Sequence, residues 1–194
     1  MWIRPPGPVG PQRTIGLLGG SFNPAHGGHL YVSDVARKAL GLNAVWWLVT
    51  PGNPLKRASE LADLITRMAF AARVAGRRAT VTDIESRLGT RYTVDTLRAL
   101  RRRFPGVRFV WLMGSDNLAG FARWKDWAAI AETVPIVVVR RPGSALDMAK
   151  SPLIRRFGQA RRLGPPPTVL VLDGPRNPQS STAIRMALEP RQMA

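Results

Sequence analysis

The sequence predicts a doubly wound α/β domain, in which a mainly parallel sheet carries helices on both faces. Short apolar runs alternate with longer stretches in which apolar residues have helical spacing, as repeated strand–helix units require. Glycine-rich and polar segments follow the apolar runs at 19–29, 51–56 and 114–116, which suits ligands bound beyond the carboxyl ends of parallel strands. The 194 residues contain no internal repeat and no second-domain boundary, so we expect one domain.

The first half of that domain is expected to alternate strictly between strands and helices. The apolar runs 14–18, 44–50 and 79–82 predict strands. Between the first two strands, residues 30–40 have helical spacing and end at Gly41, a typical helix stop. Pro51-Gly52-Asn53-Pro54 forms a turn after the second strand. The face of the next expected helix is made of Leu61, Leu64, Ile65, Met68, Ala69 and Ala72.

The second half continues the alternation, with one irregular stretch. A helix over 94–104 is expected to end at Pro105-Gly106, and strands follow at 107–113, 134–139 and 169–172, with a helix at 124–131 between the first two. The proline-containing segment 141–167 predicts a loop with one short helix over 153–157. A last helix is expected over 182–188.

Composition limits the class of protein. The chain is 45% hydrophobic and 21% charged, which is ordinary for a globular protein. It has no cysteine, which excludes disulfides, thiolate metal sites and cysteine nucleophiles and favours the cytoplasm. No apolar run is long enough to span a bilayer. Residues 1–13 are rich in proline and glycine without an apolar signal core, so we expect a flexible extension before a domain over 14–194.

The net charge of +17 raises the question of a nucleic-acid partner. The arginines are spread along the chain, and the dense cluster Arg101-Arg102-Arg103 ends a predicted helix, where cations suit the helix dipole. No nucleic-acid-binding signature accompanies them. A general arginine bias explains the charge at least as well, so a nucleic-acid partner is not expected. An anionic small substrate is compatible with either explanation.

The turn after the first strand is the most informative segment. It contains Gly19 and Gly20, and both histidines of the chain, His26 and His29, lie at its end. Glycines let backbone N–H groups approach an anion, and a helix N-terminus adds a favourable partial charge. The segment lacks G-x-G-x-x-G and a phosphate-binding loop's Gly-Lys-Ser/Thr. A turn of this kind, with two histidines three residues apart, suits a triphosphate.

The motif Gly20-Ser21-Phe22-Asn23-Pro24-Ala25-His26-Gly27-Gly28-His29 resembles the paired-histidine motif of the nucleotidylyltransferase superfamily. Near the C-terminus, Ser180-Ser181-Thr182-Ala183-Ile184-Arg185 resembles the second motif of that superfamily. Alone, it would be an ordinary helix cap. Asn23 stands where aspartate is commoner; asparagine keeps the acceptor oxygen and the turn preference, so we expect function to be retained.

Further segments resemble the bacterial nicotinate mononucleotide adenylyltransferases. The resemblance runs from about residue 15 to residue 185 and implies a Rossmann-like fold. The segments are Pro51-Gly52-Asn53-Pro54-Leu55-Lys56, Arg67-Met68, Arg91-Tyr92-Thr93-Val94-Asp95-Thr96-Leu97, Met113-Gly114-Ser115-Asp116-Asn117-Leu118, Trp124-Lys125-Asp126-Trp127 and Arg140-Arg141-Pro142-Gly143.

The resemblance implies that ATP and nicotinate mononucleotide give nicotinate adenine dinucleotide and pyrophosphate. The attacking phosphate is already ionised, so no general base is required, and catalysis should come from positioning and charge stabilisation. His26 and His29 are the expected catalytic residues, and Mg²⁺ is expected to arrive with ATP, held by phosphates and water rather than by a protein metal site. The residues expected to contact ATP are Gly19, Gly20, Ser21, Phe22, His26, His29, Ser181, Thr182 and Arg185.

The same resemblance implies a site for the mononucleotide. Its expected residues are Asn53, Lys56, Thr93, Asp116, Trp124 and Arg140. Lys56 is expected at the phosphate, and the backbone around Thr93 at the nicotinate carboxylate. Trp124 is expected to stack on the pyridine ring, and Asp116 to bind sugar hydroxyls or orient a neighbour.

Three alternatives stay open. A related transferase could act on nicotinamide mononucleotide or on phosphopantetheine, because base preference depends on backbone donors that a sequence does not display. A basic nucleic-acid-binding protein on the same fold is a third possibility. A homo-oligomer is compatible with the sequence.

Overall fold

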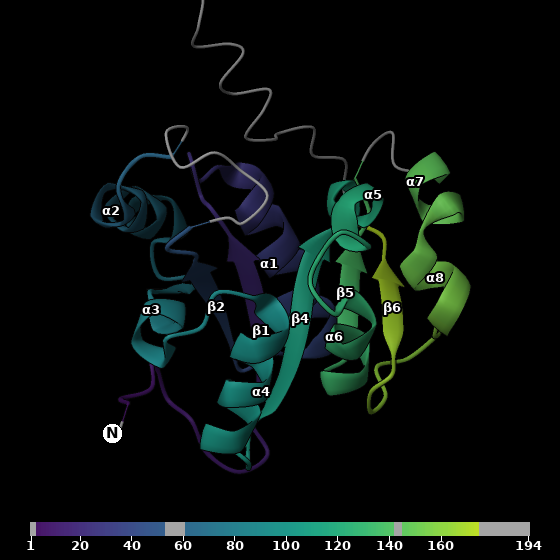
Figure 1. The fold of residues 1–194 in the computed structure, drawn as a ribbon, viewed down its shortest axis with the longest axis horizontal. Coiled ribbons are helices and arrows are strands. Elements are labelled where there is room, and N and C mark those ends of the chain that lie inside the picture. The colour runs from purple at the N-terminus through teal and green to yellow at the C-terminus, as the bar shows by residue number, and fades with distance from the viewer. Residues whose placement is uncertain (1–2, 53–60, 142–144, 175–194) are drawn as a thin grey trace, which may run out of the picture.

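A computed structural model describes residues 3–52, 61–141 and 145–174. In these ranges the strands form a six-stranded, wholly parallel sheet in the order β3-β2-β1-β4-β5-β6 (Figure 1). The strands are β1 (Thr14–Gly20), β2 (Ala44–Val49), β3 (Thr80–Thr82), β4 (Arg108–Gly114), β5 (Ile136–Val139) and β6 (Val169–Leu172). This architecture confirms the predicted doubly wound α/β fold.

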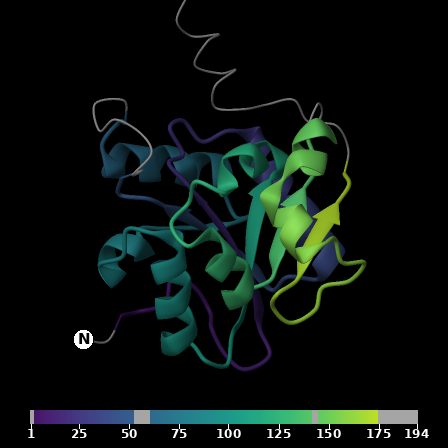
Figure 2. The ribbon, with the colours of Figure 1, turned by 45° about the vertical axis from the view of Figure 1, so that its right-hand side comes forward.

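Helices cover both faces of the sheet. They are α1 (Gly27–Leu40), α2 (Leu64–Ala75), α3 (Ile84–Leu88), α4 (Thr93–Arg103), α5 (Leu118–Phe121), α6 (Trp127–Thr133), α7 (Ala145–Lys150) and α8 (Pro152–Phe157), with a 3₁₀ turn, η2, at Ser115–Asn117. One apolar cluster joins a face of the sheet to α1 and α2, and a second joins the opposite face to α3 through α8. Figure 2 turns α7 and α8 toward the viewer, beside β6.

Strand register places the loops of interest at one edge. Gly20 of β1 pairs with Val49 of β2, and Gly114 of β4 pairs with Val139 of β5. The strand order reverses between β1 and β4, which makes their carboxyl ends the topological switch point where such sheets bind ligands. The glycine turn, the turn after β2 and the segments after β4 and β5 therefore start from the same edge.

Most predicted elements are confirmed, with shifted ends. The helix predicted from residue 61 begins at Leu64, because the Asp63 carboxylate accepts the backbone N–H of Thr66 at 2.9 Å and so caps the helix there. The helix predicted over 124–131 spans Trp127–Thr133 instead. The helix predicted over 182–188 lies outside the described residues.

Three short helices were not predicted. α3 and α5 have five and four residues, too few to display a helical period. α7 lies within the segment predicted as loop, and its six residues are likewise too few to display a helical period. In the described ranges, no helix has the length and apolar character needed to cross a membrane.

The described part of the N-terminal segment lies against the domain. Ile3 and Val9 pack on the cluster that includes Trp46, and the guanidinium of Arg87 donates to the carbonyl of Arg4 at 3.0 Å. The predicted flexibility of residues 1–13 stays a prediction.

Candidate active site at the carboxyl edge of the sheet

The glycine turn is shaped by aromatic packing. A Cβ on Gly19 would lie 2.4 Å from the indole of Trp111, so this position has no room for a side chain. Phe22 has a positive φ of 48° and is buried, with its ring stacked on Trp47 at a centroid distance of 5.1 Å. Phe22 thus holds the turn through its side chain, and any contribution it makes to nucleotide binding comes from its backbone.

Two histidines close the turn by capping α1. His26 is the N-cap residue, and its Nδ1 accepts the backbone N–H of Gly28 at 3.0 Å. Nδ1 of His29 accepts the backbone N–H of His26 at 3.2 Å, which completes a reciprocal capping box. Because each Nδ1 is an acceptor, the hydrogen of each neutral imidazole is assigned to Nε2. The two rings, whose centroids are 4.0 Å apart, therefore each carry an Nε2–H donor.

The surroundings keep both imidazoles uncharged. Burial lowers the pKa of His26 to about 4, with a further lowering from the positive charge of Arg141. Burial also lowers the pKa of His29 to about 3, and His26 and Arg141 add to that effect. At neutral pH the pair therefore acts as two hydrogen-bond donors rather than as two cations.

Asn23 retains the contact expected of an acceptor. Its side-chain oxygen accepts the backbone N–H of Ala62 at 3.4 Å, just before α2. The amide thus links the glycine turn to the segment that leads into α2, a contact that needs an oxygen but not a negative charge.

Adjacent arginines after β5 take different directions. Arg140, predicted at the mononucleotide, pairs with Asp173 at 3.1 Å. Arg141 instead reaches the carbonyl of Gly28 at 2.9 Å and the carboxylate of Asp116 at 3.3 Å. Its guanidinium therefore lies beside the first turn of α1, and its positive charge lowers the pKa of both histidines.

Asp116 pairs with this arginine, while the roles expected of Asp116 in the mononucleotide site stay predictions. Its carboxylate and the guanidinium of Arg141 lie over Gly114, where a Cβ would come within 2.3 Å of Asp116 Oδ1 and 3.0 Å of Arg141 Nε. The hydroxyl of Ser115 also accepts the backbone N–H of Arg141 at 2.8 Å. The absence of a side chain at residue 114 thus allows the segments after β4 and β5 to interlock.

Arg67 ties the turns after β1 and β2 together. Its buried guanidinium donates to the carbonyls of Ser21 at 2.7 Å, Thr50 at 2.9 Å, Pro51 at 3.4 Å and Ala62 at 2.7 Å. All four acceptors are backbone groups, so the planar fork of one arginine holds loops that belong to different strands. Arg67 was not predicted as a site residue. Its helical spacing from the other buried residues of α2 could have shown that it is buried as well.

The first turn of α4 lies beside the loop that carries Trp124. Thr93 is the first residue of α4, and the N-cap residue Tyr92 makes no side-chain capping bond. Trp124 is half-buried between Trp111 and Phe121, at centroid distances of 6.0 and 5.2 Å. Lys125, the residue after Trp124, pairs with Asp95 in the first turn of α4 at 3.2 Å, so the two elements are neighbours. The roles predicted for Thr93 and Trp124 stay predictions.

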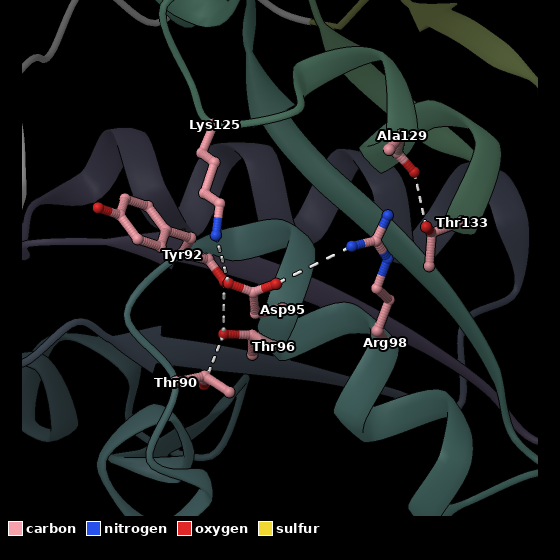
Figure 3. Close-up of polar contacts among 8 residues, drawn as sticks. All are labelled: Thr90, Tyr92, Asp95, Thr96, Arg98, Lys125, Ala129 and Thr133. Carbon is pink, nitrogen blue, oxygen red and sulfur yellow. Dashed lines mark hydrogen bonds and ion pairs between the residues drawn. The ribbon is translucent and has the colours of Figure 1, made fainter.

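A buried carboxyl group lies beneath the same turn. Glu85 of α3 accepts a hydrogen bond from the hydroxyl of Thr96 at 3.3 Å. The hydroxyls of Thr96 and Thr90 lie 2.8 Å apart (Figure 3). Burial raises the pKa of Glu85 to about 7, although the hydrogen bonds from Thr50 and Thr96 oppose that rise. Sequence reasoning missed this residue, because one glutamate in a five-residue helix has no pattern that marks it as buried.

Five predicted site residues lie outside the described residues. They are Asn53 and Lys56 of the mononucleotide set, and Ser181, Thr182 and Arg185 of the ATP set. Their roles stay predictions.

Comparison with known proteins identifies the family. The cytidylyltransferase-like family model matches residues 17–187. A probable nicotinate-nucleotide adenylyltransferase of Parvibaculum lavamentivorans is 49% identical over 185 residues, which cover 90% of this chain and 92% of that protein. The chain belongs to the nicotinate-nucleotide adenylyltransferase family. A second probable nicotinate-nucleotide adenylyltransferase, from Cereibacter sphaeroides, is 52% identical, with 89% of this chain and 96% of that protein covered.

A solved structure supports the fold of this adenylyltransferase family member. The nicotinic acid mononucleotide adenylyltransferase of Plasmodium falciparum, complexed with NaAD, superposes with a TM-score of 0.71 at 17% identity. The match covers 90% of this chain and 83% of the Plasmodium chain. The sequence relatives thus confirm the family that the motifs indicated, and the superposition confirms the fold.

Proposed function

We propose that this adenylyltransferase joins ATP and nicotinate mononucleotide to form nicotinate adenine dinucleotide and pyrophosphate. The observation that carries the proposal is the pair of neutral histidines at the sheet's switch point, each with an Nε2–H donor. A phosphate oxygen of the mononucleotide attacks the α-phosphorus of ATP. The new phosphorus–oxygen bond forms as the bond to the β-phosphate oxygen breaks, and pyrophosphate leaves.

The chain's own groups supply positioning and charge stabilisation. His26 and His29 donate from Nε2 to the oxygens of the reacting phosphate and of the leaving group, where negative charge develops. The N-terminus of α1 and the backbone of Gly19–Phe22 favour the anionic nucleotide. Neither histidine needs to accept a proton, because the nucleophile is ionised before it reacts.

The remaining ATP contacts are proposed from the family motifs. Ser181, Thr182 and Arg185 hold the β- and γ-phosphates, and a charge-assisted bond from the arginine strengthens that grip. ATP is bound as its magnesium complex, with the ion held by phosphate oxygens and water. Arg141 adds a fixed positive charge near the histidines, and Asp116 fixes its direction.

The mononucleotide is proposed to lie between α4 and the loop that carries Trp124. Backbone N–H groups around Thr93 meet the nicotinate carboxylate, because the N-cap residue Tyr92 makes no side-chain hydrogen bond to that helix end. Trp124 stacks on the pyridine ring, and Asn53, Lys56 and Arg140 serve the ribose phosphate. Arg140 could do so only by leaving Asp173, with which it pairs at 3.1 Å.

Pyrophosphate release from ATP tests the proposal when nicotinate mononucleotide, nicotinamide mononucleotide and phosphopantetheine are supplied in turn. Turnover is expected to be fastest with nicotinate mononucleotide, with nicotinate adenine dinucleotide as the second product. Faster turnover with either other acceptor would replace the proposed substrate while keeping the reaction class. Salt-dependent binding of nucleic acid without adenylyl transfer would overturn the proposal altogether.

A further inference from the structure

One lysine joins the loop of Trp124 to the first turn of α4. The loop lies between α5 and α6, and Lys125 follows Trp124 directly. The ammonium of Lys125 lies 3.2 Å from the carboxylate of Asp95 and 4.5 Å from the centroid of the Tyr92 ring (Figure 3). An ion pair and a cation–π contact thus connect the loop to two residues of the first turn of α4.

Asp95 has a second basic neighbour, which provides a built-in comparison. Arg98 lies on the same helix, three residues along, with its guanidinium 4.0 Å from the other carboxylate oxygen of Asp95. That pair acts within α4 and joins it to nothing else. Lys125 and Arg98 side chains are almost equally exposed, at 45% and 46%. The difference that matters is therefore which elements each pair connects.

The loop presents its tryptophan under tight local constraint. Trp124 packs on Trp111 and Phe121, and the residue after Lys125, Asp126, has a positive φ of 47°. Aspartate adopts this conformation more readily than most residues, and here it is the N-cap residue of α6. Because the Lys125 side chain is exposed and lies outside this packing, loss of its contacts should affect the spacing between the loop and α4 more than it affects the stability of the fold.

We propose that Lys125 is a positioning residue for the mononucleotide, which clips the Trp124 loop to the N-terminal turn of α4. This inference rests on the proposed function, because its test measures binding of the mononucleotide. The clip holds the ring-stacking indole and the carboxylate-binding helix end at a fixed separation. A ligand that needs both groups then binds without first having to order the loop.

The experiment compares Lys125→Ala, Asp95→Asn and the control Arg98→Ala in steady-state adenylyl transfer. We expect the first two variants each to raise the mononucleotide KM about threefold to tenfold, with the ATP KM and kcat within about twofold of wild type. Arg98→Ala should leave all three constants unchanged. Lys125→Arg should restore most of the loss, since a guanidinium can make both contacts. The double variant Lys125→Ala/Asp95→Asn should be no worse than the more affected single variant.

Three results would overturn the proposal that Lys125 holds the Trp124 loop to α4. Additive effects of Lys125→Ala and Asp95→Asn would show that the two residues act separately. An equal rise in both KM values would show a general structural role. A lower mononucleotide KM in Asp95→Asn would show that Lys125 acts by direct attraction of the substrate anion, because removing the carboxylate would then strengthen that attraction.

The wild-type measurement separates this proposal from the proposed function. If the wild-type protein does not use nicotinate mononucleotide, the function fails before any variant is compared. If the wild type is active and Lys125→Ala matches Arg98→Ala in every constant, the positioning role of Lys125 is refuted and the proposed function stands.

Discussion

His29 accepts a hydrogen bond from the backbone N–H of His26 through Nδ1, at 3.2 Å. Nδ1 of His26 in turn accepts the backbone N–H of Gly28, so both histidines take part in the cap of α1. Capping uses Nδ1 of each ring, whereas the proposed catalytic donation uses Nε2. This division of roles means that the two functions can be separated by substitution.

The first prediction concerns His29. Replacement by asparagine removes the Nε2–H donor but leaves an amide oxygen near the position of Nδ1, which can still accept from His26. We expect kcat to fall by ~100-fold or more, as loss of a charge-stabilising donor does. His29→Ala should lose at least as much activity and also lose stability through the missing cap. Turnover near that of the wild type in a folded His29→Asn protein would remove His29 from the catalytic assignment.

The second prediction concerns the buried carboxyl group of Glu85. Its pKa is raised from 4.5 to about 7, so the folded state binds more protons than the unfolded state between those values. Glu85 therefore lowers the free energy of unfolding as pH rises through this window. Glu85→Gln should raise the melting temperature at pH ~8.5 and make little difference near pH ~4.

A surface glutamate provides the control for that comparison. Glu132 of α6 is exposed and pairs with Arg156 at 3.6 Å, so Glu132→Gln changes the charge equally without a buried carboxyl group. We expect no comparable stabilisation at the higher pH. Identical pH profiles for the two variants would show that burial of Glu85 has no effect on its ionisation.

The third prediction concerns acid stability. The pKa values of His26 and His29 are lowered from 6.5 to about 4 and about 3, so the unfolded state binds more protons than the folded state below about pH 6.5. The histidine contribution to stability is therefore complete above that pH and is lost as pH falls through about 4 for His26 and about 3 for His29. Because Glu85 acts in the opposite sense over an overlapping range, the measurement belongs in the Glu85→Gln background.

Thermal unfolding in that background should show a melting temperature that falls as pH is lowered through this range. The variant with His26→Asn and His29→Asn added should show a shallower dependence, since asparagine does not titrate. A dependence equally steep with and without the histidines would contradict the lowered pKa values.

The fourth prediction concerns Arg67, which holds the turns after β1 and β2 at once. Lysine keeps the charge but cannot donate to four carbonyls from a planar fork. Arg67→Lys should therefore raise the KM for both ATP and mononucleotide, each by roughly tenfold. Arg73→Lys, on the exposed face of the same helix, is the matched control and should leave both constants unchanged. A rise confined to one substrate would show that Arg67 supports only one of the two turns.

Much of the site could be predicted because its signals are local. The glycine turn, the paired histidines and the first residues of α4 follow one another along short segments, and the alternation of strands and helices places those segments at one edge of the sheet. The capping role of the histidines was not predicted, because a cap depends on where the helix begins. The expected start at residue 30 lay three residues after the true start at Gly27.

The sequence by itself determined the fold class, the family and the edge of the sheet where polar chemistry gathers, since apolar periodicity and contiguous motifs are written in neighbouring residues. Only the tertiary structure decided that Arg141, rather than Arg140, contacts Asp116 and the first turn of α1, because that depends on partners as distant as Asp116 and Gly28. The same holds for the four carbonyls gathered by Arg67 and for the contact of Lys125 with Asp95. Apart from Ala62, which is five residues from Arg67, the partners of these side chains are 16 to 113 residues away. Such pairings follow from packing the helices on the sheet, not from local pattern.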